Sequence, residues 1–446
     1  MPDSVLIANR GEIAGRVART ARRLGIRVIG IYSQADAGLP YLAACDEAVL
    51  IGPSAPALSY LNAEAILAAA ARTGAAAIHP GYGFLAENAV FARQVLDAGL
   101  TWIGPSPDAI EQMGDKISAR NLMAGVGIPV ADGSGEPVPD ADAAVEVAAR
   151  IGYPVMVKAA AGGGGIGMSV ANDPEQLRSG YETARSRAER FFGNPAILLE
   201  RYLSRARHVE VQILGLADGR VIALGERDCS VQRRHQKLAE ETPSPGVGAD
   251  LRQRMQAAAV RAGEAVGYRG AGTVECLVDT RTGEFVFLEM NTRLQVEHPV
   301  TEMVTGIDLV EQQFLIADGR PVSFDPETVT PAGHAIELRI YAEDPVRFLP
   351  SPGAITEWDE PRGDGVRVDA GYAAGTTVTP YYDPMLAKLV TYGADRAQAL
   401  ERARTAVASF VISGPKTNLA FHADLLNSAE FSSGDYDTSL VSVLRP

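Results

Sequence analysis

The first 32 residues carry the signals of a strand, a helix and a second strand. A short apolar run at 4–8 leads through Asn9-Arg10-Gly11 into a helical pattern over 12–24, and a second apolar run follows at 27–32. A unit this compact predicts two parallel strands with the helix packed on one face of the sheet. Its turn has one glycine where a dinucleotide fingerprint needs three, so we expect a Rossmann-like domain without a dinucleotide.

The composition excludes several classes of protein. A formal net charge of -14 argues against a general nucleic-acid binder. Cys45, Cys229 and Cys276 lie far apart, which argues against disulfides and a structural zinc site. No apolar run approaches the ~18 residues of a membrane helix. No signal peptide is visible either, so we expect a cytoplasmic enzyme without a membrane partner.

Four consecutive glycines, Gly162–Gly165, lie between two apolar stretches that both read as strands, 154–159 and 168–171. The loop is therefore the tip of a hairpin, although Gly162–Gly167 fits the GxGxxG spacing of a helix-opening turn. Ordering four glycines costs entropy that a plain turn need not lose, and their amides are unshielded. We predict a mobile lid that closes over phosphate oxygens, with a floppy surface turn as the alternative.

Two lysines and an acidic strand end surround this hairpin. Lys158 ends the strand before the loop, and Lys116 stands at a helix start. Each lysine alone is typical of a surface, but together they offer two cations to the same phosphates. Glu200 ends the last strand of the unit, where a carboxylate and the neighbouring backbone suit a nucleoside. The pattern therefore predicts a nucleotide site between the lid and this strand.

Two apolar runs at 273–279 and 285–291 predict an antiparallel hairpin. If five residues connect them, Glu275 lies directly opposite Glu289, whereas a four-residue turn would put the two on opposite faces. Like charges across a ladder repel, and a divalent cation between them removes that cost. With Asn291 as a third oxygen ligand we predict a magnesium or manganese site, with two solvated glutamates as the alternative.

Polar residues occupy every second position from Glu289 to Glu297. An extended strand sends alternate side chains to one face, and here that face would hold Glu289, Asn291, Arg293, Gln295 and Glu297. So dense a mixture of charges and amides suits a metal and an anionic reactant, and we predict the floor of a catalytic site. The basic stretch 227–237 could face an anion beside it, although such a run is equally typical of a solvated surface.

Taken together, these motifs resemble biotin carboxylase, the ATP-grasp component of biotin-dependent carboxylases. The resemblance covers essentially the whole chain, because six long motifs occur in order. They are IANRGEI at 7–13, HPGYGFL at 79–85, MGDK at 113–116, ERDCSVQRRHQK at 226–237, YRGAGT at 268–273 and EMNTRLQVEHPVTE at 289–302.

The resemblance implies an α/β and α+β fold in three domains. These are a Rossmann-like N-terminal domain over 1–115, an ATP-grasp domain over 116–330 with a lid unit over about 131–203, and a β-rich C-terminal domain over 331–446. It also implies ATP- and bicarbonate-dependent carboxylation of biotin through carboxyphosphate, the first half-reaction of an acetyl-CoA or acyl-CoA carboxylase. Glu297 would deprotonate bicarbonate, and Arg339 would stabilise the biotin enolate.

The resemblance assigns the site residues by role. The implied catalytic residues are Glu297, Arg293, Lys237 and Arg339. Those for bicarbonate and biotin are Lys237, Arg293, Gln295, Val296 and Arg339. Those for ATP are Lys116, Lys158, Gly163, Gly164, Gly165, Glu200, Arg201, Leu203, His208, Gln232, His235 and Leu277. The implied metal ligands are Glu275, Glu289 and Asn291. Between the two cations Lys237 and Arg293, the pKa of Glu297 should be lowered.

The implied partners follow from what the chain lacks. It has no Met-Lys-Met biotinylation signal and no length for a transferase domain, so we expect a stand-alone subunit. It would act on biotin attached to a biotin carboxyl carrier protein, together with carboxyltransferase subunits. The family often forms homodimers through the N- and C-terminal domains, and Arg19 is a candidate for that interface. The final acceptor, such as acetyl-CoA, propionyl-CoA or pyruvate, is selected by the transferase.

Two other functions fit parts of the pattern. Another ATP-grasp ligase, of the carbamoyl-phosphate or purine-pathway type, would share the nucleotide site. The row Arg293, Gln295 and Glu297 together with Arg339 argues against it. A non-catalytic ATP-binding regulatory subunit is the second alternative. It is kept open by Ile166, because the family's loop usually carries Arg or Lys at that position. Biotin- and bicarbonate-dependent ATP hydrolysis separates all three functions.

Ile166→Arg should tighten ATP binding, because it returns a cation to the loop predicted to cover the phosphates. Equilibrium titration of the wild type and the variant with ATP measures the effect, and Ile166→Leu, which stays apolar, is the control. An unchanged affinity in Ile166→Arg would show that the position is neutral.

Overall fold

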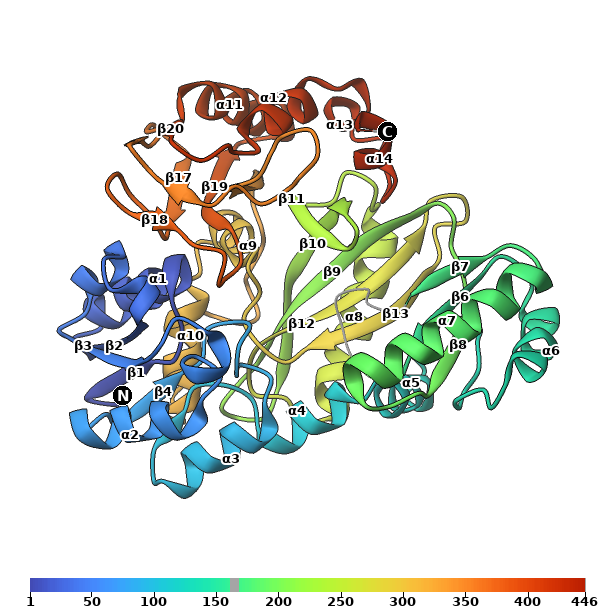
Figure 1. Cartoon of the computed structure of the whole chain (residues 1–446), viewed down its shortest axis with the longest axis horizontal. Helices are drawn as coiled ribbons and strands as arrows, with labels where there is room; N and C mark the ends of the chain where they lie inside the picture. Colours follow the sequence, from blue (N-terminus) through green and yellow to red (C-terminus); the bar gives the residue numbers. More distant parts are fainter. Residues whose placement is uncertain (161–167, 446) are drawn as a thin grey trace.

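The computed structural model of the chain describes residues 1–160 and 168–445. The N-terminal domain is a five-stranded parallel sheet in the order β3-β2-β1-β4-β5 (Figure 1, blue). Its strands are β1 (Ser4–Ile7), β2 (Arg27–Ser33), β3 (Glu47–Gly52), β4 (Ala77–His79) and β5 (Thr101–Trp102). The predicted strand–helix–strand unit is confirmed, because β1 and β2 are parallel and α1 (Gly11–Arg23) lies between them in sequence.

Alternate residues of β1 face different helices. Val5 and Ile7 pack in one core with α1, while Leu6 packs on the other face. That second core includes Ile66 of α2 (Ala63–Thr73) and Phe91 of α3 (Ala89–Asp97). Helices therefore cover both faces, which is why this strand is apolar throughout rather than alternating.

The lid unit is a three-stranded antiparallel sheet covered by two helices on one face (Figure 1, green, right). It consists of α6 (Ala141–Ile151), β6 (Val155–Ala159), β7 (Ser169–Ala171), α7 (Pro174–Phe192) and β8 (Ile197–Arg201). Val155 and Val157 face the helices, so Lys158 lies on the opposite face. The pairing of β6 with β7 confirms the predicted hairpin, while the glycine loop 161–167 itself lies outside the described residues.

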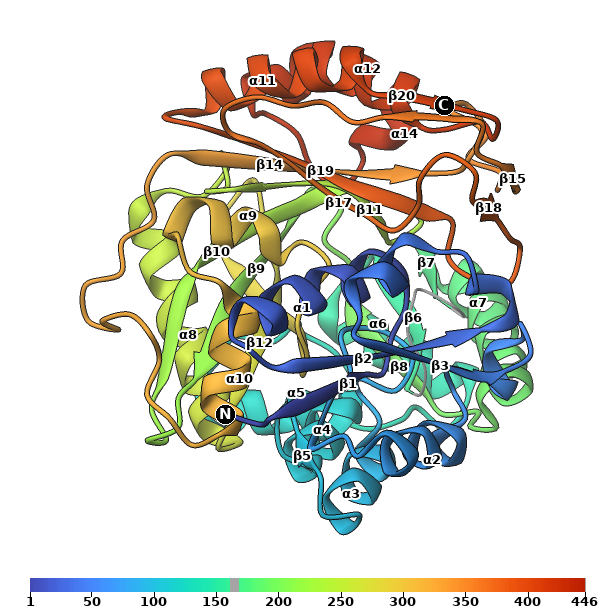
Figure 2. The same ribbon diagram turned by 90° about the vertical axis from the view of Figure 1, so that its left-hand side faces the viewer.

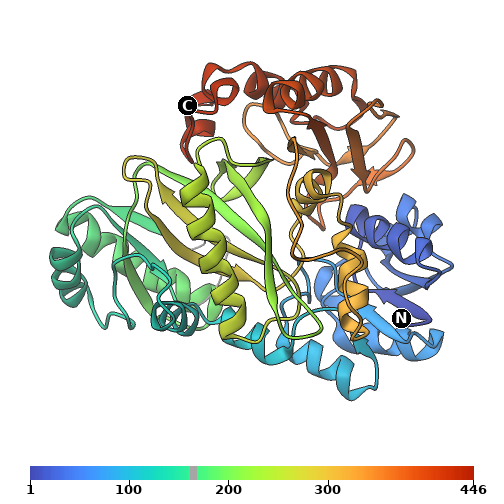
Figure 3. The same cartoon turned by 180° about the vertical axis from the view of Figure 1, so that it is seen from behind.

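The central sheet has eight antiparallel strands in the order β13-β12-β9-β10-β11-β14-β19-β17. Its strands are β9 (Ala206–Gly215), β10 (Val221–Arg233), β11 (Gln236–Thr242), β12 (Gly270–Asp279), β13 (Phe285–Asn291), β14 (His334–Tyr341), β17 (Val366–Ala370) and β19 (Met385–Gly393). The β11–β14 pairing makes the central and C-terminal parts of the chain share one sheet. Figure 3 shows α8 (Ala249–Ala265) across the back of its central half, and Figure 2 shows α11 (Arg396–Ser409) and α12 (Leu419–Asn427) over its C-terminal strands.

Shorter elements connect these layers. The remaining helices are α4 (Pro107–Gly114), α5 (Lys116–Gly125), α9 (His298–Thr305), α10 (Leu309–Ala317), α13 (Ala429–Ser433) and α14 (Leu440–Leu444). The remaining strands are β15 (Gly353–Ala354), β16 (Glu357–Asp359), β18 (Thr377–Val378) and β20 (Val411–Ser413). Among the described residues, no helix combines the length and apolarity that crossing a bilayer requires.

Glu241 on β11 joins the C-terminal segments to the central sheet. Its carboxylate contacts His334 Nε2 on β14 (2.6 Å) and accepts hydrogen bonds from Arg396 Nε on α11 (2.6 Å) and Tyr436 Oη (2.6 Å). Burial opposes ionisation, but the hydrogen bonds from His334 and Arg396 outweigh it and lower the pKa of Glu241 to about 2. One fully buried carboxylate thus satisfies groups from a strand, a helix and the connection between α13 and α14.

Glu241→Gln should destabilise the protein at pH 7 by about 3–5 kcal/mol, the usual cost of breaking a buried ion pair on one side. The folded-state pKa lies below the ordinary value of 4.5, so this stabilisation is complete above that value and is lost as the pH falls toward 2. Urea unfolding of both proteins at falling pH should show the difference shrinking. Glu47→Gln is the control, because Glu47 and its partner Arg27 are exposed. A difference that does not depend on pH would contradict the ionised role of Glu241.

Candidate active site

Glu275 on β12 and Glu289 on β13 lie directly opposite each other, which confirms the predicted pair. The five residues 280–284 connect the two strands, but the expected register at the turn is wrong by one residue, because Val278 rather than Asp279 pairs with Phe285. An extra residue on β13, Leu288, forms a bulge that shifts the register back by one before the two glutamates meet. The alignment of the carboxylates therefore depends on the bulge as well as on the turn.

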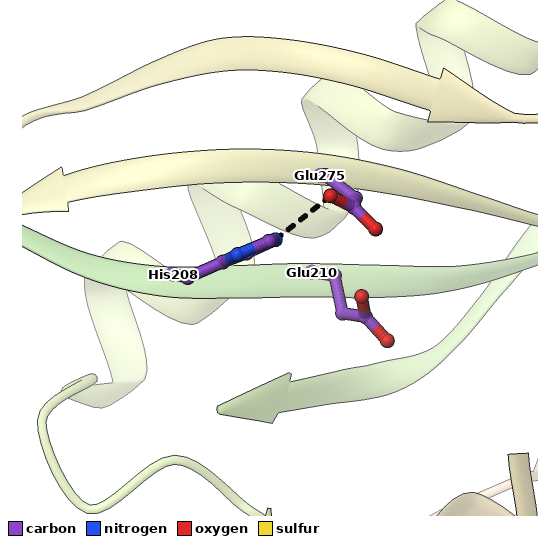
Figure 4. A group of neighbouring side chains, drawn as sticks. All are labelled: His208, Glu210 and Glu275. Atoms are coloured by element: carbon purple, nitrogen blue, oxygen red, sulfur yellow. Dashed lines mark ion pairs between the residues drawn. The ribbon is translucent and has the colours of Figure 1, made fainter. Parts of the chain in front are cut away.

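Glu275 is contacted by polar groups from several strands and loops. Its Oε1 accepts hydrogen bonds from Lys237 Nζ (2.9 Å), Asn291 Nδ2 (2.8 Å) and Gln295 Nε2 (3.0 Å). Its Oε2 lies 2.8 Å from His208 Nε2, a close ion-pair contact without hydrogen-bond alignment (Figure 4). Burial opposes ionisation, but Lys237 and His208 outweigh it and lower the pKa of Glu275 well below its ordinary value.

The donor set fits a hard divalent cation. Burial and the facing charge of Glu275 raise the pKa of Glu289, with Lys116 acting in the opposite direction. A cation between the two carboxylates would remove this repulsion. Asn291 is already engaged, because its Oδ1 accepts from Arg293 Nη2 (2.9 Å) and its Nδ2 donates to Glu275. As a ligand it would therefore share its oxygen with the guanidinium or turn its amide.

Lys237 on β11 lies at the centre of the buried charges. Its Nζ donates to Glu210 Oε2 (2.7 Å) and Glu297 Oε1 (2.6 Å), in addition to Glu275. Glu210, which Arg227 Nε holds at 2.6 Å, is missing from the residues predicted from the sequence. It lies two positions from His208 on β9, so both side chains share one face of the strand (Figure 4). The two-residue spacing from His208 was the signal in the sequence by which Glu210 could have been found.

Glu297 lies between two cations. Its Oε1 accepts from Lys237, and its Oε2 lies 2.9 Å from Arg339 Nη2 on β14. Burial opposes ionisation, yet Lys237 and Arg339 hold the pKa of Glu297 well below its ordinary value. The expected lowering is found, but the second cation is Arg339 rather than Arg293. Arg339 Nε also donates to Glu240 Oε1 at 2.6 Å, which keeps the guanidinium in place.

The prediction of a strand running to Glu297 is wrong. β13 ends at Asn291, and a loop leads to α9. Glu87 of the N-terminal domain takes the next two donors, because its Oε1 accepts from the Thr292 N–H (3.1 Å) and its Oε2 from Arg293 Nε (2.7 Å). Sequence reasoning missed Glu87, and its place beside the HPGYGFL motif was the only signal. The alternating polar residues from Glu289 to Glu297 still meet at one site, but those after Asn291 reach it from a loop rather than from a strand.

The predicted nucleotide contacts of the lid unit lie close together. Lys158 forms an ion pair with Glu200 on the neighbouring strand β8. Lys116 begins α5, interacts electrostatically with both, and has its pKa lowered chiefly by burial. The N–H of Arg201 donates to the carbonyl of Asp132 (2.7 Å), so among its backbone groups Arg201 has only the carbonyl to offer to a base.

A tight turn between β10 and β11 carries His235. Arg234 and His235 both have positive φ, 49° and 68°, as in the type I′ turns that usually hold Asn-Gly. Residues in this conformation cost energy and are concentrated at functional sites. Burial and the nearby His208 lower the pKa of His235. Gln232 is the cross-strand partner of Lys237. The turn therefore brings Gln232 and Lys237 together, next to the carboxylates that Lys237 contacts.

The structure describes some of the remaining predicted ATP and bicarbonate contacts but not the glycines of the loop. Leu277 pairs with His208 across β12 and β9 and therefore shares the face of Glu275. Leu203 is half-buried in the connection after β8, and the carbonyl of Val296 accepts from Lys388 Nζ (2.8 Å). Gly163, Gly164 and Gly165 lie outside the described residues.

Family models match the chain along almost its whole length. Residues 1–110 match the biotin carboxylase N-terminal domain, and residues 337–443 match the biotin carboxylase C-terminal domain. The chain belongs to the biotin carboxylase family. Residues 115–324 match the ATP binding domain of the carbamoyl-phosphate synthase L chain. The C-terminal match, which includes Arg339, favours the carboxylase over the other ATP-grasp ligases.

Relatives with known names and structures agree with this assignment. A biotin carboxylase of Pseudomonas aeruginosa is 50% identical over 435 residues, covering 97% of this chain and 96% of that protein. A Campylobacter jejuni biotin carboxylase, solved as a β-γ-ATP complex, superposes with a TM-score of 0.97 at 44% identity and covers 99% of both chains. The biotin carboxylase domain of the Hydrogenobacter thermophilus 2-oxoglutarate carboxylase was solved as a dimer with MgADP, ADP and bicarbonate. It superposes with a TM-score of 0.95 at 43% identity, covering 99% of this chain and 98% of that chain. The predicted fold is confirmed.

Arg339→Met should raise the pKa of Glu297, because one of the cations that holds it low is removed. Glu297 would then take up a proton at a higher pH than in the wild type. Infrared difference spectra against Arg339→Met/Glu297→Gln, recorded during acid titration, report the protonated carboxyl of Glu297. Arg254→Met on the exposed side of α8 is the control. A titration identical to that of the wild type would contradict the coupling.

Proposed function

We propose that this chain carboxylates biotin carried by another protein, using ATP and bicarbonate. The observation that carries the proposal is the position of Glu297, which is ionised and held between Lys237 and Arg339. An ionised carboxylate can accept a proton from bicarbonate, and the two cations favour a second anion beside it.

The residues support a sequence of two steps. Glu297 takes the proton of bicarbonate, whose oxygen then attacks the γ-phosphate of ATP to form carboxyphosphate and release ADP. Carboxyphosphate breaks down to carbon dioxide and phosphate, the phosphate takes the ureido proton of biotin, and the enolate attacks carbon dioxide. The guanidinium of Arg339 would stabilise the enolate, because it keeps its charge and presents fixed donors.

The assignment of the other residues is part of the same proposal. Lys237, Arg293, Gln295 and the Val296 backbone would bind bicarbonate, and Arg339 would bind biotin. ATP would lie between the lid unit and the central sheet, against Lys116, Lys158, Glu200, Arg201, Leu203, His208, Gln232, His235, Leu277 and the glycines Gly163, Gly164 and Gly165. Magnesium or manganese, held by Glu275, Glu289 and Asn291, would neutralise charge on the phosphates.

We also propose the domain boundaries 1–115, 116–330 and 331–446, with the lid unit over about 131–203. Separate sheets in the N-terminal domain and in the lid unit support the first division and the lid. The central and C-terminal domains share one sheet, so their boundary lies between adjacent strands of a continuous ladder.

The proposed partners are a biotin carboxyl carrier protein, carboxyltransferase subunits and a second copy of the chain. Arg19 on α1 is exposed and forms an ion pair with Asp369 on β17. It lines a surface cavity of about 480 Å³ between the N- and C-terminal domains, together with Arg16 and Arg23. None of the proposed catalytic residues lines this cavity, which supports a role in subunit contact. The acyl acceptor would be selected by the carboxyltransferase subunits.

Glu297→Gln should abolish bicarbonate-dependent ATP hydrolysis while leaving ATP binding unchanged. Loss of a general base typically costs ~10²–10⁴-fold in rate. Turnover is measured with and without free biotin and bicarbonate, and ATP affinity by titration. Glu284→Gln, an exposed acid in the β12–β13 turn, is the control. Unchanged turnover would refute the base assignment, and hydrolysis independent of biotin would favour another ATP-grasp ligase.

A further inference from the structure

Buried side chains hold two consecutive carbonyl groups in the loop before α9. The carbonyl of Gln295 lies 2.7 Å from His298 Nδ1, and that of Val296 accepts from Lys388 Nζ at 2.8 Å. The side chains of both partners are fully buried. In a trans peptide the N–H points away from the C=O. The N–H groups of Val296 and Glu297 therefore point away from these two partners.

These two N–H groups have no hydrogen-bond partner among residues 1–160 and 168–445. One of the two residues, Glu297, is fully buried, and the other, Val296, is half-buried. Buried backbone N–H groups are almost always paired, with protein, water or ligand. Two adjacent donors next to Lys237 and Arg293 form a small concave site of the kind that binds an anion.

Lys388 reaches this loop from the C-terminal sheet. Its Nζ also lies 3.2 Å from Glu12 Oε2 on α1, so it contacts the N-terminal domain and the loop at once. In β19 it pairs with Arg339 on β14 and with Asp369 on β17. Because Lys388 is fully buried and already bonded to the Val296 carbonyl, it acts on the loop rather than on a substrate.

His298 donates from a defined ring nitrogen. A carbonyl oxygen can only accept, so Nδ1 carries a proton. Burial lowers the pKa of His298 well below its ordinary value, and the cations Lys388, Arg16 and Arg367 lower it further. The ring is therefore neutral, and its Nε2 has no partner among the described residues. A neutral donor can hold the Gln295 carbonyl without adding charge.

We propose that His298 and Lys388 are positioning residues for the anionic substrate. By holding two successive peptide planes, they aim the N–H groups of Val296 and Glu297 at bicarbonate. This inference rests on the proposed function, because it assumes that bicarbonate is the anion that binds beside Glu297. Donors held in advance at the site of a charged reactant need no reorganisation when it binds.

A matched pair of variants at His298 tests the proposal. The amide nitrogen of His298→Asn can replace Nδ1, whereas that of His298→Gln extends to the position of Nε2. His298→Gln should weaken bicarbonate binding about tenfold, the scale of one lost hydrogen bond to a charged group, and His298→Asn should restore most of it. Binding of isotope-labelled bicarbonate is measured by NMR line broadening in the presence of ADP. ATP affinity and thermal unfolding are measured on the same samples.

Lys388→Met/Glu12→Gln provides a second test, because it removes the cation without leaving its buried carboxylate charged. It should also weaken bicarbonate binding about tenfold with ATP affinity kept. Full bicarbonate affinity in folded His298→Gln or Lys388→Met/Glu12→Gln overturns the inference. An equal loss of ATP affinity, or failure of His298→Asn to recover, also overturns it by showing a general structural role. Wild-type protein that binds bicarbonate without biotin-dependent turnover would refute the proposed function alone.

Discussion

The ammonium group of Lys237 is surrounded by three carboxylates that are almost entirely shielded from water. Glu210, Glu275 and Glu297 each lie within 3 Å of its Nζ. Removing so many charges from water is costly, and close opposite charges with full hydrogen bonding must offset that cost. Arg227 and Arg339 complete the balance by holding Glu210 and Glu297 from the other side. Without Lys237, three like charges would face one another in a low-dielectric interior.

This charge balance joins parts of the chain that are far apart in sequence. Arg339 comes from the C-terminal strands, Glu87 from the N-terminal domain, and the carboxylates from the central sheet. Glu297 lies on the loop that all three parts contact. The position of Glu297 therefore depends on the packing of all three parts, which explains why so many polar residues here are buried rather than solvated.

The sequence predicted the elements well because their periodicity is local, as in the first strand–helix–strand unit. The Glu275–Glu289 pair was predicted correctly although the register at the turn was not, because Leu288 adds a bulge that no hydrophobic pattern reveals. The predicted strand past Asn291 is absent for a tertiary reason, since Glu87 of the N-terminal domain accepts from the Thr292 N–H that a strand would have used. The cation that contacts Glu297 in addition to Lys237 is likewise decided by tertiary packing. The sequence alone makes Arg293 and Arg339 equally plausible, and the structure places Arg339 there.

The continuous ladder between β11 and β14 limits how this protein can open. Glu240 and Glu337 are cross-strand neighbours in that ladder, and Arg339 follows two positions along β14. Domains that share hydrogen-bonded strands cannot hinge apart without breaking the sheet, so Glu240 and Arg339 behave as parts of one rigid frame. Entry and release of large reactants must then depend on elements outside the frame. The three-stranded unit of β6, β7 and β8 has its own sheet and its own core, so a movement of this unit would leave the central sheet intact.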